Sequence, residues 1–215
     1  MLACLAAGRL HVRKGDIPRA IEFLEKCRQA QRLGNFEVWT ASISSTVGYA
    51  YLLGGRLDEA VALLNEAIEQ ANSTKSMFGH SLRLTYLGEA LLLMGRPEEA
   101  LHHARWALET SRTQQERGHE AYALRLLAEI AAHQVPLDVE AAEAAYRLAL
   151  DLTEQLGMRP LKAQCHLGLG QLGLRADQSE LAEAHLSAAS AMFHDMGMSQ
   201  WLEKAEAGVS RYARR

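Results

Sequence analysis

The chain has 215 residues, of which 48% are hydrophobic and 23% charged, and its formal net charge is −3. These values are typical of a folded globular protein and exclude a disordered or fibrous chain. Alanine and leucine make up about a third of the residues and aromatic residues only 6%, a composition that favours helices over sheets.

The charge balance and the apolar runs also bear on partners and location. A nearly neutral chain lacks the basic surface of a nucleic-acid-binding domain, so we expect no nucleic-acid partner. No apolar run approaches the roughly 18 residues of a transmembrane helix, so we expect no membrane partner either. The three cysteines form no Cys-x-x-Cys pair and no even-numbered disulfide set, which predicts a cytoplasmic location.

Helix start and stop signals predict a single array over residues 1–215. In chain order, they predict hairpins of two helices each at about 2–34, 36–75, 77–117, 119–157 and 159–196, followed by a last helix at about 199–212. The last helix carries charged residues and is predicted to cap the array. No such cap precedes the first hairpin, which raises the hypothesis that the chain is a fragment of a larger protein.

The hairpins recur with a period of about forty residues. Each contains a turn followed by a helix start that leads to an alanine, and these alanines are Ala20, Ala60, Ala100, Ala142 and Ala182. A second small residue stands in the first helix of each hairpin, namely Gly8, Gly48, Gly88, Ala128 and Gly170. Small residues at these points let two helices cross closely, so each unit is predicted to be a hairpin that stacks on its neighbours.

These residues resemble the tetratricopeptide-repeat pattern. The second hairpin contains Val47-Gly48-x2-Tyr51, followed by Ala60-x3-Leu64, and the third contains Leu87-Gly88 and Ala100 at the same spacing. The closing proline of that pattern is absent, which accounts for a period longer than the standard one. Long repeats of this kind are similar to the C-terminal arrays of bacterial signalling ATPases, including ATPase-linked nucleotide cyclases and maltose-activator-like transcription regulators. The resemblance implies an all-α, right-handed α-solenoid.

The resemblance also implies a set of partner-binding residues on the concave side. The motif positions that line the groove correspond here to Arg9, Arg13, Ser45, Tyr49, Thr85, Glu89, Arg125, Glu129, His133, Gln171 and Arg175. Such a mixture of polar, charged and aromatic side chains suits a bound peptide or helix. The ladder of Arg125, Glu129 and His133 has a plainer interpretation as an intrahelical ion pair on a solvated face.

We expect no catalytic residues, no cofactor and no metal site. The serines follow no nucleophile-elbow pattern, and Cys4 and Cys27 stand at packing positions. The adjacent His102 and His103 face different ways around a helix. Trp106 is predicted to lie partly exposed on an outer helix, either as a contact for a partner or as a cover for the next hairpin.

The leading hypothesis is therefore a non-enzymatic scaffold, the regulatory array of a bacterial signalling protein, that binds a peptide or partner domain in its groove. The alternative is a sensor array in which a small molecule or peptide controls an attached ATPase, cyclase or DNA-binding domain. Self-association and the identity of the partner stay open at this point.

Overall fold

The computed structural model describes residues 1–34, 37–75 and 77–212, and the chain divides into two compact units. The first unit covers Met1–Thr110 and the second covers Ser111–Arg215. The repeat spacing does not signal this division, and a single array over the whole chain stays a prediction.

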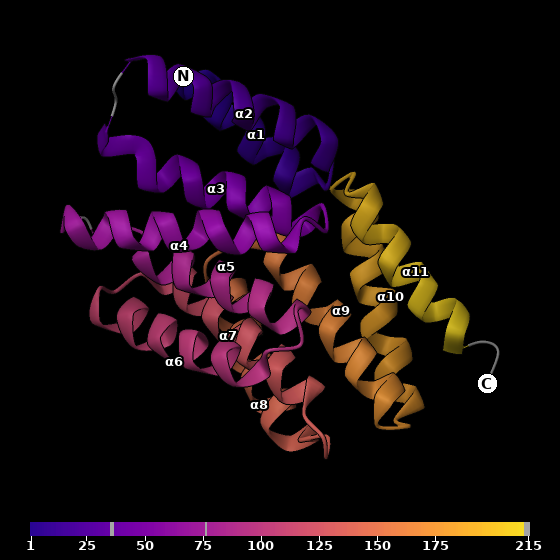
Figure 1. The fold of residues 1–215 in the computed structure, drawn as a ribbon. Coiled ribbons are helices and arrows are strands. Elements are labelled where there is room, and N and C mark those ends of the chain that lie inside the picture. Colours follow the sequence, from indigo (N-terminus) through magenta and orange to yellow (C-terminus); the bar gives the residue numbers. More distant parts are fainter. Residues whose placement is uncertain (35–36, 76, 213–215) are drawn as a thin grey trace. The chain divides into compact units, whose positions relative to one another are not determined.

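The first unit consists of helical hairpins (Figure 1). Its helices are α1 (Leu2–Lys14), α2 (Ile17–Gly34), α3 (Thr40–Leu53), α4 (Leu57–Ser73), α5 (His80–Leu93) and α6 (Pro97–Thr113), with a short 3-10 turn η1 (Glu37–Trp39) before α3. Helix α2 packs on α3 and α4 packs on α5, so each hairpin stacks on the next.

The second unit continues the pattern with α7 (Arg117–His133), α8 (Val139–Gln155), α9 (Arg159–Arg175), α10 (Ser179–Asp195) and the C-terminal helix α11 (Ser199–Tyr212). Helix α8 packs on α9, and α11 packs on α10. The described residues contain no strand. The predicted all-α class, built from five hairpins and a last helix, is confirmed.

Glycine or a short polar residue ends the first helix of several hairpins. Gly15 follows α1 with φ of 80°, a conformation that L side chains rarely adopt, and the same turn in the fifth hairpin uses Asp177 with φ of 55°. In the fourth hairpin, Asp138 caps α8 by accepting a hydrogen bond of 3.0 Å from the Ala141 backbone N–H. Helix ends of this kind can be predicted from the sequence because they depend on only a few neighbouring residues.

The cores of the hairpins are built on the repeated small residues. Ala20, Ala60, Ala100, Ala142 and Ala182 are all fully buried. A Cβ added at Gly8 would lie 2.5 Å from two side-chain carbons of Leu24, so the Leu24 side chain of α2 packs directly on the backbone of α1. The predicted role of these residues as close crossings is confirmed.

Trp39 and Trp201 both stand at junctions between predicted hairpins, where we expect a tryptophan to pack, and the structure treats them differently. Trp201 packs with its ring 5.9 Å from that of Phe193, in the core of the second unit. Trp39 is 38% exposed, so its assignment to packing was wrong. It is the last residue of the short turn η1. Cys27 is buried as predicted, whereas Cys4 is only partly covered.

No helix in the described ranges combines the length and hydropathy of a bilayer span.

Candidate functional site

In the first unit, the predicted binding residues lie on the first helices of three successive hairpins. We call Arg9, Arg13, Ser45, Tyr49, Thr85 and Glu89 the first inner face; they come from α1, α3 and α5. Arg9 joins two of these helices, because its Nη2 donates to Ser42 Oγ at 2.9 Å and to Thr46 Oγ1 at 3.5 Å. The hydroxyl groups position the guanidinium without neutralising its charge.

An aromatic pair joins α3 to α5 on the same side. The rings of Tyr49 and Tyr86 are stacked with centroids 3.8 Å apart and an angle of 14° between their planes. Tyr49 is buried, and Tyr86 is partly exposed. The ring stack therefore continues the surface begun by Arg9 across a third helix.

Several residues of the first inner face are buried. The Ser45 hydroxyl donates to the Ser42 carbonyl at 3.1 Å and the Thr85 hydroxyl to the Ser81 carbonyl at 3.0 Å, so both are used by their own helices. Glu89 is also buried. Arg9 and Arg13 are the exposed members, and any partner reaches these first.

In the second unit, the predicted residues lie on α7 and α9. We call Arg125, Glu129, His133, Gln171 and Arg175 the second inner face. Arg125 and Glu129 form an ion pair one helical turn apart, and Arg125 is buried. His133 Nδ1 lies 2.7 Å from the Glu129 carbonyl oxygen. The contacts of Arg125, Glu129 and His133 are thus made within α7, as the intrahelical interpretation predicts. Gln171 and Arg175 of α9 are exposed.

The groups beneath the second inner face are held in their protonated forms. Burial, helped by the Glu129 carboxylate, raises the pKa of Tyr146 well above its usual value. Burial also raises the pKa of the Cys165 thiol to about 12. A thiol that stays protonated is a poor nucleophile, so Cys165 offers packing and no covalent chemistry here.

Three residues of these faces lay outside the predicted set. Thr46 and Tyr86 contact predicted residues but occupy positions that the repeat pattern does not assign to the groove. In α11, burial lowers the pKa of Lys204, and the Glu129 carboxylate opposes this shift more weakly. Of the three, only Lys204 could have been suspected from the sequence, because it lies in an amphipathic last helix.

Trp106 lies on α6 among three imidazoles. Its ring is 38% exposed and meets the buried His80 ring edge-on, with centroids 5.5 Å apart. His103 stacks against it at 6.4 Å, and burial lowers the pKa of His103. Among the described residues, no three side chains of His, Cys, Asp or Glu are grouped to hold a metal ion.

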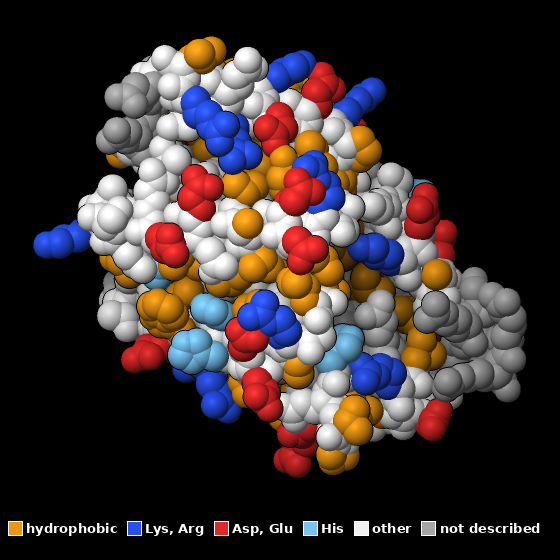
Figure 2. All heavy atoms as spheres, in the orientation of Figure 1, with side chains coloured by type: hydrophobic (Ala, Val, Ile, Leu, Met, Phe, Trp, Pro, Cys, Tyr) orange, Lys and Arg blue, Asp and Glu red, His pale blue; other side chains and the backbone are white. Residues whose placement is uncertain are grey.

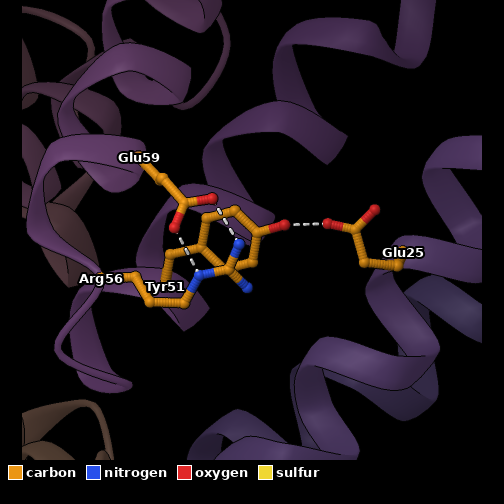
Figure 3. A network of polar contacts seen from close by, with 4 residues as sticks. All are labelled: Glu25, Tyr51, Arg56 and Glu59. Atoms are coloured by element: carbon orange, nitrogen blue, oxygen red, sulfur yellow. Dashed lines mark hydrogen bonds and ion pairs between the residues drawn. The ribbon is translucent and has the colours of Figure 1, made fainter.

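A polar network joins the first two hairpins on the outer side (Figure 3). The Tyr51 hydroxyl donates to Glu25 of α2, and the Arg56 guanidinium lies 3.6 Å from the centre of the Tyr51 ring. Arg56 Nε also donates to Glu59 at 2.7 Å. The four side chains come from α2, from α3, from α4 and from the turn before α4, so the network joins α2 of the first hairpin to the second hairpin.

The comparisons with known proteins agree with this geometry. The tetratricopeptide-repeat family model matches residues 2–73, which covers α1 to α4. This match shows that residues 2–73 resemble tetratricopeptide repeats. No curated protein sequence matches the chain.

Solved structures share the tetratricopeptide fold over nearly the whole chain. A Rap protein in complex with competence and sporulation factor aligns over 90% of this chain with a TM-score of 0.78 and 16% identity, and the chain spans 55% of it. A signal-transduction ATPase from Pyrococcus horikoshii with a tetratricopeptide-repeat sensor aligns over 96% of this chain, with a TM-score of 0.65 and 19% identity, and the chain spans 31% of it. A Rap conjugation gene regulator of plasmid pLS20, solved with the Phr* peptide, aligns over 96% of this chain with a TM-score of 0.57 and 18% identity, and the chain spans 61% of it. At these identities, the likeness establishes the fold alone.

Proposed function

We propose that this chain is a non-catalytic interaction module that binds a peptide, or an exposed segment of a partner protein, on the inner faces of its hairpins. The observation that carries the proposal is the continuity of the first inner face. Arg9, its hydroxyl partners and the Tyr49–Tyr86 stack link side chains from three hairpins into one surface. Arginine and tyrosine are the residue types that most often anchor protein interfaces.

The charge distribution suits a protein partner. Acidic and basic side chains are interspersed with apolar ones over the visible surface (Figure 2). Such a surface lacks the single-sign field that draws nucleic acid. The neutral Cys165 and Tyr146 beneath the second inner face favour binding over catalysis.

A selection from a library of short synthetic peptides on the immobilised full chain tests the proposal. The selected peptides are then titrated against Arg13→Ala and Arg175→Ala, one substitution on each inner face, with Arg105→Ala as the matched control on the outer helix α6. All three arginines are exposed, so the substitutions leave the fold intact. We expect one inner-face variant to weaken binding by about tenfold and the control to leave it unchanged. Equal affinities for all three variants would remove the inner faces as the binding site.

The alternative function, a sensor array of a cytoplasmic bacterial signalling protein, is favoured by two of the structural neighbours. One is described as an ATPase with a tetratricopeptide-repeat sensor, and another was solved with a peptide. Native mass spectrometry of the freshly purified chain separates the two readings, since a sensor is expected to carry a small ligand and a scaffold to appear at its own mass of 23.7 kDa. In either case Trp106 is the candidate for a second, outer contact.

A further inference from the structure

One side of α1 is apolar and uncovered. We call Ala3, Ala6 and Leu10 the open face of α1; all three are exposed, and Leu10 is 53% exposed. Leu2, at the edge of this face, is 54% exposed. The spacing of three and four residues places them on one stripe of the helix.

Two of these positions, those of Leu10 and Ala3, are buried in each of the later hairpins. Aligned on Gly8, Gly48, Gly88, Ala128 and Gly170, the position of Leu10 corresponds to Ala50 (0% exposed), Ala90 (0%), Ile130 (1%) and Leu172 (1%). The position of Ala3 corresponds to Ile43, Arg83, Ala123 and Cys165, all of which are buried. The open face of α1 is therefore the counterpart of a surface that this fold normally covers.

The later hairpins also show what covers it. Helices α2, α4 and α8, the second helices of their hairpins, pack on α3, α5 and α9 respectively. In the second unit the contact is direct at the position of Ala6: a Cβ added at Gly168 of α9 would lie 2.7 Å from Cε1 of the Tyr146 ring of α8. The occupant of such a face is a helix.

The charges indicate which kind of helix fits. Helix α9 carries three basic residues and no acidic one, and its cover α8 carries four acidic residues and one basic one. Lys162 of α9 forms an ion pair with Glu154 of α8. Helix α1 repeats the charge of α9, with Arg9, Arg13 and Lys14 and no acidic residue. The first 34 residues together contain seven basic and three acidic residues, in a chain whose net charge is −3.

We propose that the open face of α1 binds an acidic amphipathic helix of a partner protein, which packs an apolar stripe on Ala3, Ala6 and Leu10 and directs carboxylates toward Arg13 and Lys14. A second copy of the chain is a poorer occupant, because a twofold contact would bring two basic first hairpins together. This surface adjoins the first inner face and shares Arg13 with it, whereas Ala3, Ala6 and Leu10 belong to neither inner face.

The probe is a synthetic, end-capped peptide with the sequence of α4, Leu57–Ser73, which has four acidic residues and no basic one. The α4 peptide has Leu64 at the position of Tyr146 in α8. The Tyr146 ring lies so close to α9 that only a glycine, Gly168, fits beneath it, whereas α1 has Ala6 at that position. A peptide with a leucine there is therefore the better probe for α1. Binding to the full chain is followed by backbone amide chemical shifts. We expect the shifts on α1, and an affinity about tenfold higher than that of the D58K/E59K/E66K/E69K peptide at low salt.

Two substitutions in the full chain complete the test. Leu10→Gln is expected to weaken binding of the α4 peptide by about tenfold, whereas Leu148→Gln, at a leucine that is 52% exposed on α8, leaves it unchanged. The proposal is overturned if the peptide does not bind, if the acidic and lysine peptides bind equally, or if the shifts fall away from α1. A dimer in sedimentation that Leu10→Gln dissociates would assign the face to a second copy instead. None of these results depends on Arg175 or on the selected inner-face peptides, so the two proposals fail separately.

Discussion

In the first unit, polar side chains join neighbouring hairpins. In the second unit, α9 is packed through its glycines, toward α8 of the preceding hairpin at Gly168 and toward α10 of its own hairpin at Gly170 and Gly173. Between α2, α3 and α4, the contacts are made by the Glu25–Tyr51–Arg56 network, and between α1 and α3 by Arg9 and its hydroxyl partners. In the second unit, α9 carries three buried glycines, at 168, 170 and 173, against α8 and α10. A Cβ at Gly173 would lie 2.8 Å from the Ala182 backbone nitrogen.

The comparison shows that one repeat geometry has two kinds of vulnerability. Where long side chains bridge the helices, the loss of a donor or a ring weakens the joint. Where glycines let the backbones approach, the addition of a single methyl group is enough, since a packed interior has no room to accept it. We therefore expect the two units to lose stability through different kinds of substitution.

The largest effect is expected at Tyr146, whose ring fills the contact between α8 and Gly168 of α9 in the second unit. Its ring is 2% exposed and lies over Gly168. Tyr146→Ala removes the ring and leaves a cavity that the glycine cannot fill, so we expect a loss of about 3–5 kcal/mol in the free energy of unfolding. Urea denaturation followed by circular dichroism measures it, and a loss below about 1 kcal/mol would show that the joint collapses to fill the space.

An added methyl group at Gly173 is expected to cost about 1–3 kcal/mol, because the nearest atoms belong to the Ala182 backbone and cannot rotate away. The matched control is Gly118→Ala on α7 of the same unit, where the nearest atom is the Met158 sulfur at 3.6 Å. The control gains helix propensity without a clash and should be stabilised by up to about 1 kcal/mol. If both variants shift in the same direction, close approach at Gly173 is not what limits the joint.

In the first unit, Tyr51→Phe keeps the ring under Arg56 and removes only the hydroxyl that donates to Glu25. Because the bond is partly exposed, we expect a loss of about 1 kcal/mol. A double-mutant cycle with Glu25→Ala, which removes the acceptor, isolates the bond, and its coupling energy should match the loss. Additive single effects would mean that the ring, and not the hydroxyl, holds α2 to α3.

Residue spacing predicted the fold because each hairpin is specified locally. The buried alanines and the turn phrases recur at a nearly constant period, so they were found without knowledge of the neighbouring helices. The third hairpin even repeats the Arg56–Glu59 pair as Arg96–Glu99, with Nε to Oε1 at 2.6 Å. The network of the second hairpin does not recur there, because Leu91 stands where Tyr51 stands in the second.

The binding residues were less predictable because their exposure depends on how adjacent helices are rotated. Tyr86 stacks on Tyr49 although the two are 37 residues apart and therefore out of phase with the repeat. Thr85 and Arg125 were expected to face a partner and are buried. The periodicity of a single helix predicts neither the ring stack nor the burial of these two side chains.

The smallest effect, and the most specific to the second unit, is a dependence of stability on pH at the joint between α9 and α10. His166 Nδ1 lies 2.8 Å from His185 Nδ1, a hydrogen bond that requires one bare nitrogen. Burial, followed by the charge of His185, lowers the pKa of His166 to about 4, and burial lowers the pKa of His185. Lys162 lowers the pKa of His166 further, and Glu154 opposes it.

Since the folded state binds these protons less readily than the unfolded chain, the stability from this pair is fully present above about pH 6.5 and is lost as the pH falls toward 4. Water screens the half-exposed rings, so we expect the loss to be about 1 kcal/mol or less. Urea denaturation at pH 7 and pH 5 measures it, with His166→Gln removing the dependence and the exposed His194→Gln retaining it. If the His166→Gln variant kept the full pH dependence of stability, the titrating groups would lie elsewhere in the chain.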